Sequence, residues 1–571
     1  MPHHCSHLTG VVTACLVIII ISGTTSFGQD LENLSEKEPI KVNGGLSLSQ
    51  IGYTARGIPN RRDPYSYFLT GNVNVSLYGW SIPLSFAVSN QNRSFQQPFN
   101  QFGLHPTYKW ATAHIGYASM TFSPYTLAGH IFRGAGVDLS PGKFHFAAMY
   151  GNLQRAVAWD SVNNIKPAFK RDGMGIKTGY RDGNKYAEVS VFHAKDEINS
   201  IPEIPGNDRL LPEENLVVGL SVGKSIFDKV VVAGEWATSA LTRDTRAEKG
   251  NERAPFTQVG YDTRLSTSYY NAIKASANYQ GEGYTAGIGY ERIDPGFRTH
   301  GAYYFNSDLV NYTVNASANL FESKLAFNAS GGLQHDNLDH TKMSTMNRVV
   351  ASLNVNYAPT AKLALNANYS NFQSYTNIRS QFVNINQLTP YDNLDTLKFT
   401  QLSQSINVGA NYMLANNQQR RQFITTNLSI QDAAEHQSQV TQNSGSRFYN
   451  INTSYSLTLV PMNLTMSLSY NANQNTGPAT NLVTHGPAAS VNKSFLQRKM
   501  RVSLSAAYNN TVSEGENLNR ILNIRSNATY VLLKKHNLSL GLVAVNREAK
   551  TGSGPQSFTE YTGTLTYSYA F

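Results

Sequence analysis

Apolar and polar residues alternate along much of this chain, and this period of two restricts its fold more than any other feature. The final segment, YTGTLTYSYAF, shows the alternation best. Every second residue of it is large, aromatic or glycine: Tyr561, Gly563, Leu565, Tyr567, Tyr569 and Phe571. The residues between them are threonine, serine and alanine. Because successive side chains of a β-strand point to opposite faces, the segment is predicted to be a strand with one apolar and one polar face.

The same alternation recurs throughout the chain, for example over 353–357, 363–369, 406–412, 464–470 and 502–508. Only 15% of the residues are charged, although tyrosine (32) and phenylalanine (26) are abundant. No apolar run after residue 28 is long enough for a membrane-spanning helix. A soluble β-sandwich also alternates, but it does not usually continue for hundreds of residues with so little charge. The pattern predicts an all-β fold, a single large transmembrane antiparallel up-and-down β-barrel.

Short turns alternate with longer loops between the predicted strands. Turns are expected at 140–143, 182–184, 280–283, 321–322, 358–361, 415–418, 460–463, 494–496 and 534–535. Loops are expected at 159–170, 196–212, 243–264, 295–301, 375–398, 433–444, near Asn473, at 511–515 and at 548–555. The count is roughly 26 strands (22–26), and an even number places both termini in the periplasm. The two long segments Arg243–Arg264 and Tyr375–Lys398 are candidates for folding into the lumen.

The first 28 residues have the pattern of a secretory signal peptide. An apolar run, Val11–Ile21, is followed by Ser26-Phe27-Gly28, a small-x-small pattern that predicts cleavage between Gly28 and Gln29. The run is preceded by histidines and no Lys or Arg, which is unusual. The alternative, a lipoprotein signal at Cys15, requires the apolar run before the cysteine, whereas here most of it follows. The predicted organisation is a signal peptide (1–28), a short periplasmic segment (29–40) and the barrel (41–571), with both cysteines confined to the leader.

The C-terminal YTGTLTYSYAF and the alternation before it resemble a Gram-negative outer-membrane β-barrel of the large, plugless porin-like type. The resemblance covers about residues 41–571 and assigns no subfamily. It implies location in the cell outer membrane, with contacts to outer-membrane lipid and lipopolysaccharide. It also implies that Tyr567, Tyr569 and Phe571 form the signal read by the barrel-assembly machinery. Residues 29–40 leave no room for a plug domain before the first strand. Nucleic acid is not an expected partner.

Three motifs were weighed for chemistry. Asp172–Gly179 is rich in glycine but lacks the spacing of a phosphate-binding loop, so it is interpreted as a strand whose glycines admit a crowded neighbour. A second group could hold a divalent cation, or it could be an ordinary solvated loop: His335, Asp336, Asp339 and His340. Arg61–Pro64 is interpreted as a turn in an early loop. No catalytic motif stands out, and neither an enzyme activity nor a cofactor is predicted.

Two loops are strongly charged. One is acidic and contains Asp196, Glu197, Glu203, Asp208, Glu213 and Glu214. The other mixes Arg243, Arg246, Lys249, Arg253 and Arg264 with Asp244, Glu248 and Glu252. Charged loops of this kind usually face water, and the alternative for the basic loop is contact with lipopolysaccharide phosphates or a partner.

The predicted function is a pore or transporter that passes solutes across the outer membrane. The alternative is a barrel subunit of a larger secretion, assembly or uptake complex, in which a partner protein closes the lumen. The net charge of +10 would favour anionic solutes modestly. Loops folded inward would favour a self-contained pore, and an uncovered lumen would favour a missing partner.

Overall fold

The computed structural model describes residues 40–90, 101–159, 167–201, 210–250, 257, 261–342, 347–371, 373–374, 401–435, 446–477, 480–549 and 557–571. The predicted signal peptide, with Gly28 and Gln29, lies outside these residues, and so do Glu203, Asp208, Glu252, Arg253 and the segment Tyr375–Lys398. No helix among the described residues is long and apolar enough to cross a membrane.

Strands make up about three quarters of the described residues, which also include one 3-10 turn at Ile198–Ser200. The strands are β1 (Ile40–Arg56), β2 (Tyr65–Leu77), β3 (Trp80–Ser89), β4 (Gln101–Leu104), β5 (Thr107–Tyr108), β6 (Ala111–Thr121), β7 (Ala128–Leu139), β8 (Phe144–Gln154), β9 (Lys170–Asp182), β10 (Lys185–Glu197), β11 (Glu214–Ile226), β12 (Val230–Thr242), β13 (Thr267–Gln280), β14 (Tyr284–Ile293), β15 (Leu309–Leu320), β16 (Leu325–His335), β17 (Asn347–Thr360), β18 (Leu363–Ser370), β19 (Gln373–Ser374), β20 (Gln401–Asn416), β21 (Arg420–Glu435), β22 (Ser446–Leu459), β23 (Leu464–Gly477), β24 (Thr480–Phe495), β25 (Met500–Ser513), β26 (Glu516–Leu532), β27 (His536–Ala549) and β28 (Phe558–Ala570).

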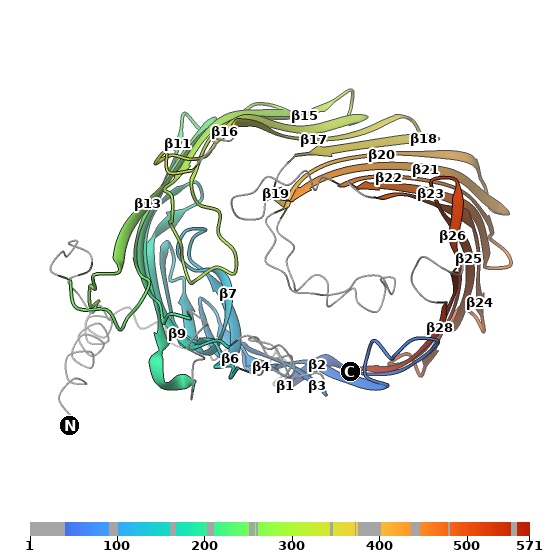
Figure 1. Ribbon diagram of the computed structural model, residues 1–571, viewed down its shortest axis with the longest axis horizontal. Coiled ribbons are helices and arrows are strands. Elements are labelled where there is room, and N and C mark those ends of the chain that lie inside the picture. Colours follow the sequence, from blue (N-terminus) through green and yellow to red (C-terminus); the bar gives the residue numbers. More distant parts are fainter. Residues whose placement is uncertain are drawn as a thin grey trace.

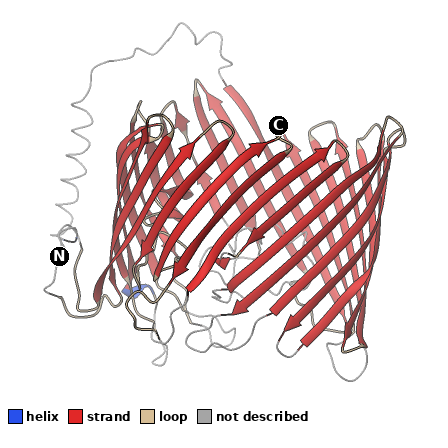
Figure 2. Cartoon of the chain, turned by 90° about the horizontal axis from the view of Figure 1, so that it is seen from above, coloured by secondary structure: helices blue, strands red, loops and turns tan. Residues whose placement is uncertain are grey.

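These strands form one closed antiparallel barrel (Figure 1). β4 and β5 both lie between β3 and β6, and β18 and β19 both pair with β20, so each pair of labels makes one interrupted strand. The barrel therefore has 26 strands. It closes where β1 pairs with β28, from Gly45↔Ala570 to Arg56↔Thr559. The all-β barrel and its strand number, both predicted from the sequence, are confirmed, and Figure 2 shows the long tilted strands side by side.

The two ends of the barrel differ in their connections. One end, called the short-turn end below, carries tight turns such as Tyr78–Gly79, with φ of 47° and 89°. A positive φ at both central residues suits the twist of the flanking strands. The described chain ends meet at this end, where the amide N of Gly44 donates to the carbonyl O of Phe571 at 3.1 Å. The opposite end, called the long-loop end, carries the longer segments.

Most predicted turns match the structure, but two predicted loops are wrong. The segment 511–515 is a turn at Glu514–Gly515, both with positive φ, so β25 and β26 extend farther than expected. Around Asn473, β23 continues to Gly477, which pairs with Thr480 of β24. Polar residues at these strand ends resembled loop sequence, although their backbones are paired. The turn between β11 and β12, at Phe227–Lys229, was not predicted.

The outer face carries the apolar residues and two belts of aromatic side chains. Near the short-turn end the belt contains Tyr108, Phe144, Tyr180, Tyr279, Tyr284, Tyr357, Tyr412, Phe495, Tyr530 and Tyr567. Nearer the long-loop end it contains Tyr117, Tyr150, Tyr290, Tyr312, Tyr369, Tyr508 and Tyr561. Between them lie exposed aliphatic residues such as Ile176, Val191 and Leu220. Two aromatic belts around an apolar band are the surface that a lipid bilayer requires.

The seam between the first and last strands has its own side-chain contacts. On the inner face, Ser47 and Ser49 bond Ser568 and Thr566 at 3.0 and 2.9 Å. Towards the long-loop end the buried hydroxyl of Tyr53 donates to Glu560 at 2.6 Å. Glu560 is also 3.7 Å from Arg61, whose guanidinium lies over the Phe558 ring. The early loop therefore helps to close the barrel.

We expect Tyr53→Phe to destabilise the barrel by about 1.5–3 kcal/mol, because it removes a hydrogen bond to a buried carboxylate. The loss should appear as a lower urea midpoint of the lipid-reconstituted protein. Tyr65→Phe is the matched control, since its hydroxyl makes an exposed bond of 3.3 Å to Gln50. Equal effects of both substitutions would show that the Tyr53–Glu560 bond does not hold the seam.

Candidate functional site: the lumen

The inner face of the barrel is divided into two parts of different chemistry. Over β6–β15 it carries several charged pairs and a buried apolar area, which is covered by two segments of the long-loop end, 122–127 and 294–308. Buried wall residues such as Phe132, Phe192 and Val217 pack with Phe122, Leu127, Tyr125 and Phe297 from these segments. Apolar residues on a face that would otherwise meet water are buried by this packing, which gives the barrel an internal core along one side.

Hydrogen bonds hold the two inward segments to the wall and to each other. Tyr125 donates to Glu291 of β14 at 2.5 Å, and Thr299 donates to the carbonyl of Thr126 at 2.6 Å. Gly301 lies so close to the same strand connection that a Cβ would be 2.3 Å from the Thr126 carbonyl O. The inward segments are therefore fitted parts of the fold.

Over β16–β25 most inner-face side chains are small, polar and uncharged, and the exceptions Arg421 and Arg501 lie near the short-turn end. The small polar side chains include Asn328, Ser330, Ser352, Asn354, Asn356, Asn366, Asn368, Ser405, Asn407, Asn411, Thr425, Asn427, Ser429, Asn450, Asn452, Ser454, Ser456, Thr465, Ser467, Ser469, Asn471, Asn473, Ser490, Asn492, Ser503 and Ser505. Several bond across strands, such as Ser467 with Ser490 at 2.6 Å and Thr458 with Thr465 at 3.0 Å. We call this surface the amide wall. Its side chains are exposed or half-buried, so they are open to a solute.

Charged residues of the inner face are concentrated on the covered side and are mostly paired. Glu188 bonds Arg181 at 2.7 Å and lies 3.1 Å from Lys177. Lys274 lies 4.0 Å from Glu291, and Arg171 lies 2.7 Å from Asp196. These pairs neutralise one another, so they do not make a basic ring around the lumen.

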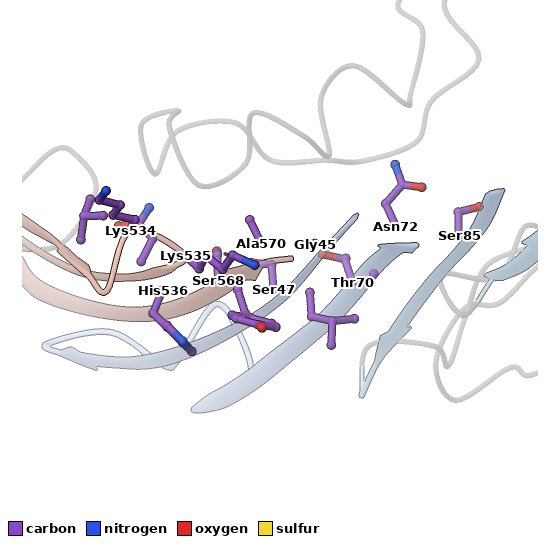
Figure 3. A pocket seen from close by; sticks show the side chains of 15 residues that line it. Gly45, Ser47, Thr70, Asn72, Ser85, Lys534, Lys535, His536, Ser568 and Ala570 are labelled. Carbon is purple, nitrogen blue, oxygen red and sulfur yellow. Dashed lines mark hydrogen bonds between the residues drawn. The ribbon is translucent and has the colours of Figure 1, made fainter. Parts of the chain in front are cut away.

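At the short-turn end, basic residues outnumber the acidic residues near them. The turns there contain Lys109, Lys229, Lys324, Lys362, Arg498, Lys499, Lys534 and Lys535, with Asp228, Glu282 and Glu322 as the nearby acids. Beside the seam, Lys534 and Lys535 border a cavity of about 540 Å³ that also contacts Ser47, Thr70, Asn72 and Ser568 (Figure 3). Basic residues thus outnumber acidic residues at this mouth of the lumen. The sequence alone did not show that these basic residues lie together.

The predicted infolding of Arg243–Arg264 is wrong for its described residues. Tyr261 packs with Leu216, Ala240 and Tyr269, which lie on the outer face of β11–β13. Its hydroxyl bonds Thr242 at 2.7 Å on the same face. The described residues Tyr261 and Thr242 therefore meet on the outside of the barrel, while the segment 294–308 folds inward. Within Arg243–Arg264, Arg246 pairs with Asp244, and Lys249 pairs with Asp262.

The other motifs are placed as follows. Asp172–Gly179 lies within β9, and a Cβ on Gly175 would be 2.7 Å from the Phe122 ring, as the crowded-strand interpretation predicted. Among the described residues, no group of three His, Cys, Asp or Glu side chains could hold a metal. Asp336 instead pairs with Lys342 at 2.8 Å. On the outer face Glu214 bonds His193 and Lys195, whereas Asp196 and Glu213 bond Arg171.

The proposed assembly residues lie at the short-turn end of β28. The Tyr567 hydroxyl is 2.7 Å from Nδ1 of His536, and the Tyr569 ring centroid is 4.6 Å from that of His536. The Phe571 ring lies 5.6 Å from Tyr569. Tyr567 is exposed on the outer aromatic belt.

A closed barrel satisfies its backbone hydrogen bonds internally, and an apolar outer band with aromatic belts can only be stable in lipid. The protein is therefore a transmembrane β-barrel. Neither a protein-family model nor a curated protein matches its sequence.

Solved structures of similar shape are barrels with very different sequences. They include the E. coli P pilus tip assembly intermediate PapC-PapD-PapK-PapG, at 12% identity and TM-score 0.42, covering 92% of this chain and 60% of that chain. OccK3 (OpdO) of Pseudomonas aeruginosa has 10% identity and TM-score 0.32, covering 95% and 98%. The ferric enterobactin receptor (PfeA) mutant of the same species has 9% identity and TM-score 0.42, covering 93% and 80%. The chain spans less than two thirds of the first of these. With TM-scores below 0.5, this likeness says nothing about function.

His300 joins the inward segment to the charged residues of the long-loop end. Arg171 donates to its Nδ1 at 3.1 Å, so Nδ1 must be unprotonated, and Nε2 lies 3.4 Å from Glu213. Burial, together with Arg171 and Arg298, holds the pKa of His300 well below its usual value. His130 and His193 act in the same direction. The docked segment therefore requires a neutral imidazole.

We expect the segment 294–308 to undock as the pH falls below about 6.5. Below this pH, His300 binds a proton when the segment is undocked but not when it is docked. The free energy of docking therefore becomes less favourable by up to about 1.4 kcal/mol per pH unit. Hydrogen exchange of this segment, corrected for intrinsic rates, should accelerate up to about tenfold per unit over this range. In His300→Asn the acceleration should disappear. If the variant kept the same pH dependence of hydrogen exchange, groups other than His300 would be its cause.

Proposed function

We propose that the protein is an outer-membrane pore that passes hydrophilic, uncharged solutes. The amide wall supports this proposal most directly. Its side chains can exchange hydrogen bonds with water and with solutes, and they do not hold ions by charge. A lumen lined in this way stays hydrated, which favours passage over tight binding.

The expected preference for anions is restricted in this proposal to the short-turn mouth. Lys534, Lys535, Arg498 and Lys499 would raise the local concentration of anions there. The wall beyond the mouth has little charge to continue that effect. Net charge is therefore expected to influence entry more than passage.

We further infer that the short-turn end faces the periplasm, with both termini there. Short turns on the periplasmic side are usual for such barrels. Cleavage near Gly28, lipopolysaccharide contact at the long-loop end, and recognition of Tyr567, Tyr569 and Phe571 by the assembly machinery are parts of the same proposal. Labelling of a cysteine introduced at Lys535 in intact cells tests the orientation, because reaction with an impermeant reagent would contradict it. Deleting Phe571 should lower the amount of folded barrel in the membrane.

We expect the purified protein to form large, stable, weakly selective openings in a planar bilayer. The double substitution Asn407→Asp and Asn427→Asp should shift selectivity towards cations roughly two- to fivefold, because it places charge on the water-filled lumen. The reversal potential in a KCl gradient measures this shift. Asn407→Gln with Asn427→Gln is the neutral control.

Two results would contradict the proposal. Strong anion selectivity that the aspartates do not change would mean that another part of the chain controls passage. A folded barrel that never conducts would favour the alternative, a subunit whose lumen is closed by a partner protein.

A further inference from the structure

We propose that the amide wall is a binding track for neutral oligosaccharide or polysaccharide chains. This inference rests on the proposed pore function and names its cargo. It follows from three features of the inner wall: the asparagines form two rows, glycines make room for them, and a phenylalanine lies on each side of the second row.

The asparagines are directly opposite one another on neighbouring strands. One row runs through Asn328, Asn354, Asn368 and Asn407 on β16, β17, β18 and β20. A second row runs through Asn427, Asn452 and Asn471 on β21, β22 and β23. Neighbouring strands are about 4.8 Å apart, so each row offers an amide at roughly that spacing. An extended chain with repeated hydroxyl groups can therefore bind at several positions along a row.

Glycines in the rows give the amides space. Gly409 lies between Asn366 and Asn427, and a Cβ there would be 2.3 Å from Oδ1 of Asn366. On the adjoining part of the wall, Asn315 donates to Asn278 at 3.1 Å across Gly287, where a Cβ would be 2.0 Å from Oδ1 of Asn278. The side chains thus lie flat over the wall at these points, which leaves amide edges accessible from the lumen.

The amides have unused hydrogen-bonding capacity. Asn354 bonds Asn368 and accepts from Asn356 at 3.0 Å, and Asn452 bonds Asn471. Each amide offers two N–H donors and a carbonyl with two lone pairs, so one bond between two amides uses a quarter of their capacity. Sugar hydroxyls also donate and accept hydrogen bonds, so they can bond to the amides at each position along the wall.

Phe423 and Phe448 add aromatic contacts to the amide wall. Phe423 is opposite Ser456 on the inner face near the short-turn end, and Phe448 is opposite Gln431 near the long-loop end. Both rings are half-buried. An aromatic ring can pack against the apolar face of a sugar ring, while neighbouring polar groups fix its orientation.

Other polymers fit the track less well. A polyanion loses hydration on entering and would need Arg or Lys partners along its path. An unfolded polypeptide carries apolar groups and charges of both signs, for which the amide wall has few counterparts. The neutral saccharide chain is the cargo that this chemistry favours.

The test uses maltoheptaose as the probe and the purified full-length protein in a planar bilayer. We expect it to produce resolvable blocks of the ion current. Polyethylene glycol of equal size accepts hydrogen bonds but does not donate them along its length, so it should block more weakly. Polyglutamate and a neutral peptide are the competing probes.

Asn354→Leu combined with Asn452→Leu should weaken the maltoheptaose block by about tenfold or more, because one amide is lost from each row. The open-channel current should stay nearly unchanged. Asn354→Gln with Asn452→Gln should keep most of the block, and Asn72→Leu on β2 is the inner-face control outside the rows. Heat-modifiable migration on gels verifies that each variant is folded.

Binding of fluorescent maltoheptaose to the detergent-purified protein is measured by anisotropy, which does not depend on conduction. Binding that the paired leucines abolish supports the track even when no current is seen, in which case only the pore proposal fails. A conducting protein that neither binds the sugar nor distinguishes it from polyethylene glycol would overturn the track and leave the pore intact. Stronger block by polyglutamate or by the peptide would also overturn it.

Discussion

Closure of the sheet is the constraint on which the rest of this structure depends. Within lipid, a strand edge would leave its N–H and C=O groups without partners at a cost of several kcal/mol each. Pairing β1 with β28 removes both edges at once. Tyr53, Glu560, Arg61 and Phe558 then reinforce this junction, where Tyr53 and Glu560 are 507 positions apart. Every other feature of the chain is arranged around this closed wall.

Closure also divides the side chains into two sets with different freedom. The outer set must be apolar between the aromatic belts, and it changes little around the barrel. The inner set is less restricted, and here it differs from one side to the other. Around β6–β15 it carries charged pairs and an apolar area packed beneath inward segments, whereas around β16–β25 it is mostly amide and hydroxyl. The function must therefore be sought in the inner set.

The fold could be predicted from the sequence because alternation of period two is a local signal. The segment Tyr561–Ala570 shows which residues face lipid, and the same test applies to strand after strand. The lumen could not be predicted so well, because its features depend on neighbours across strands. Asn354 and Asn368 look like ordinary polar residues until their register places them opposite each other. The amide wall would have been found by pairing the predicted strands in register and looking for asparagines at opposite positions.

Loop length was a poor guide to which segment enters the lumen. The length of Arg243–Arg264 favoured an inward fold, but Tyr261 has its apolar partners on the outer face. The segment 294–308 enters because Phe297 and Phe305 can join the inner cluster around Ala237 and Ala272. Its sequence signal was the pair of phenylalanines together with Gly301, and only the register shows that an apolar inner wall lies beside them.

The uneven inner wall has a mechanical consequence as well as a chemical one. A wide barrel held only by backbone ladders has no core, since water fills the space that side chains fill in a smaller barrel. Packing of Phe132, Phe192 and Phe297 supplies a core along one side without blocking the other. The packed side can therefore fix the shape of the barrel. The amide wall opposite does not have to form a core, so it can stay hydrated and carry small side chains. Stability and passage are thus assigned to different strands, so substitutions in the amide rows are expected to alter passage with little cost to folding.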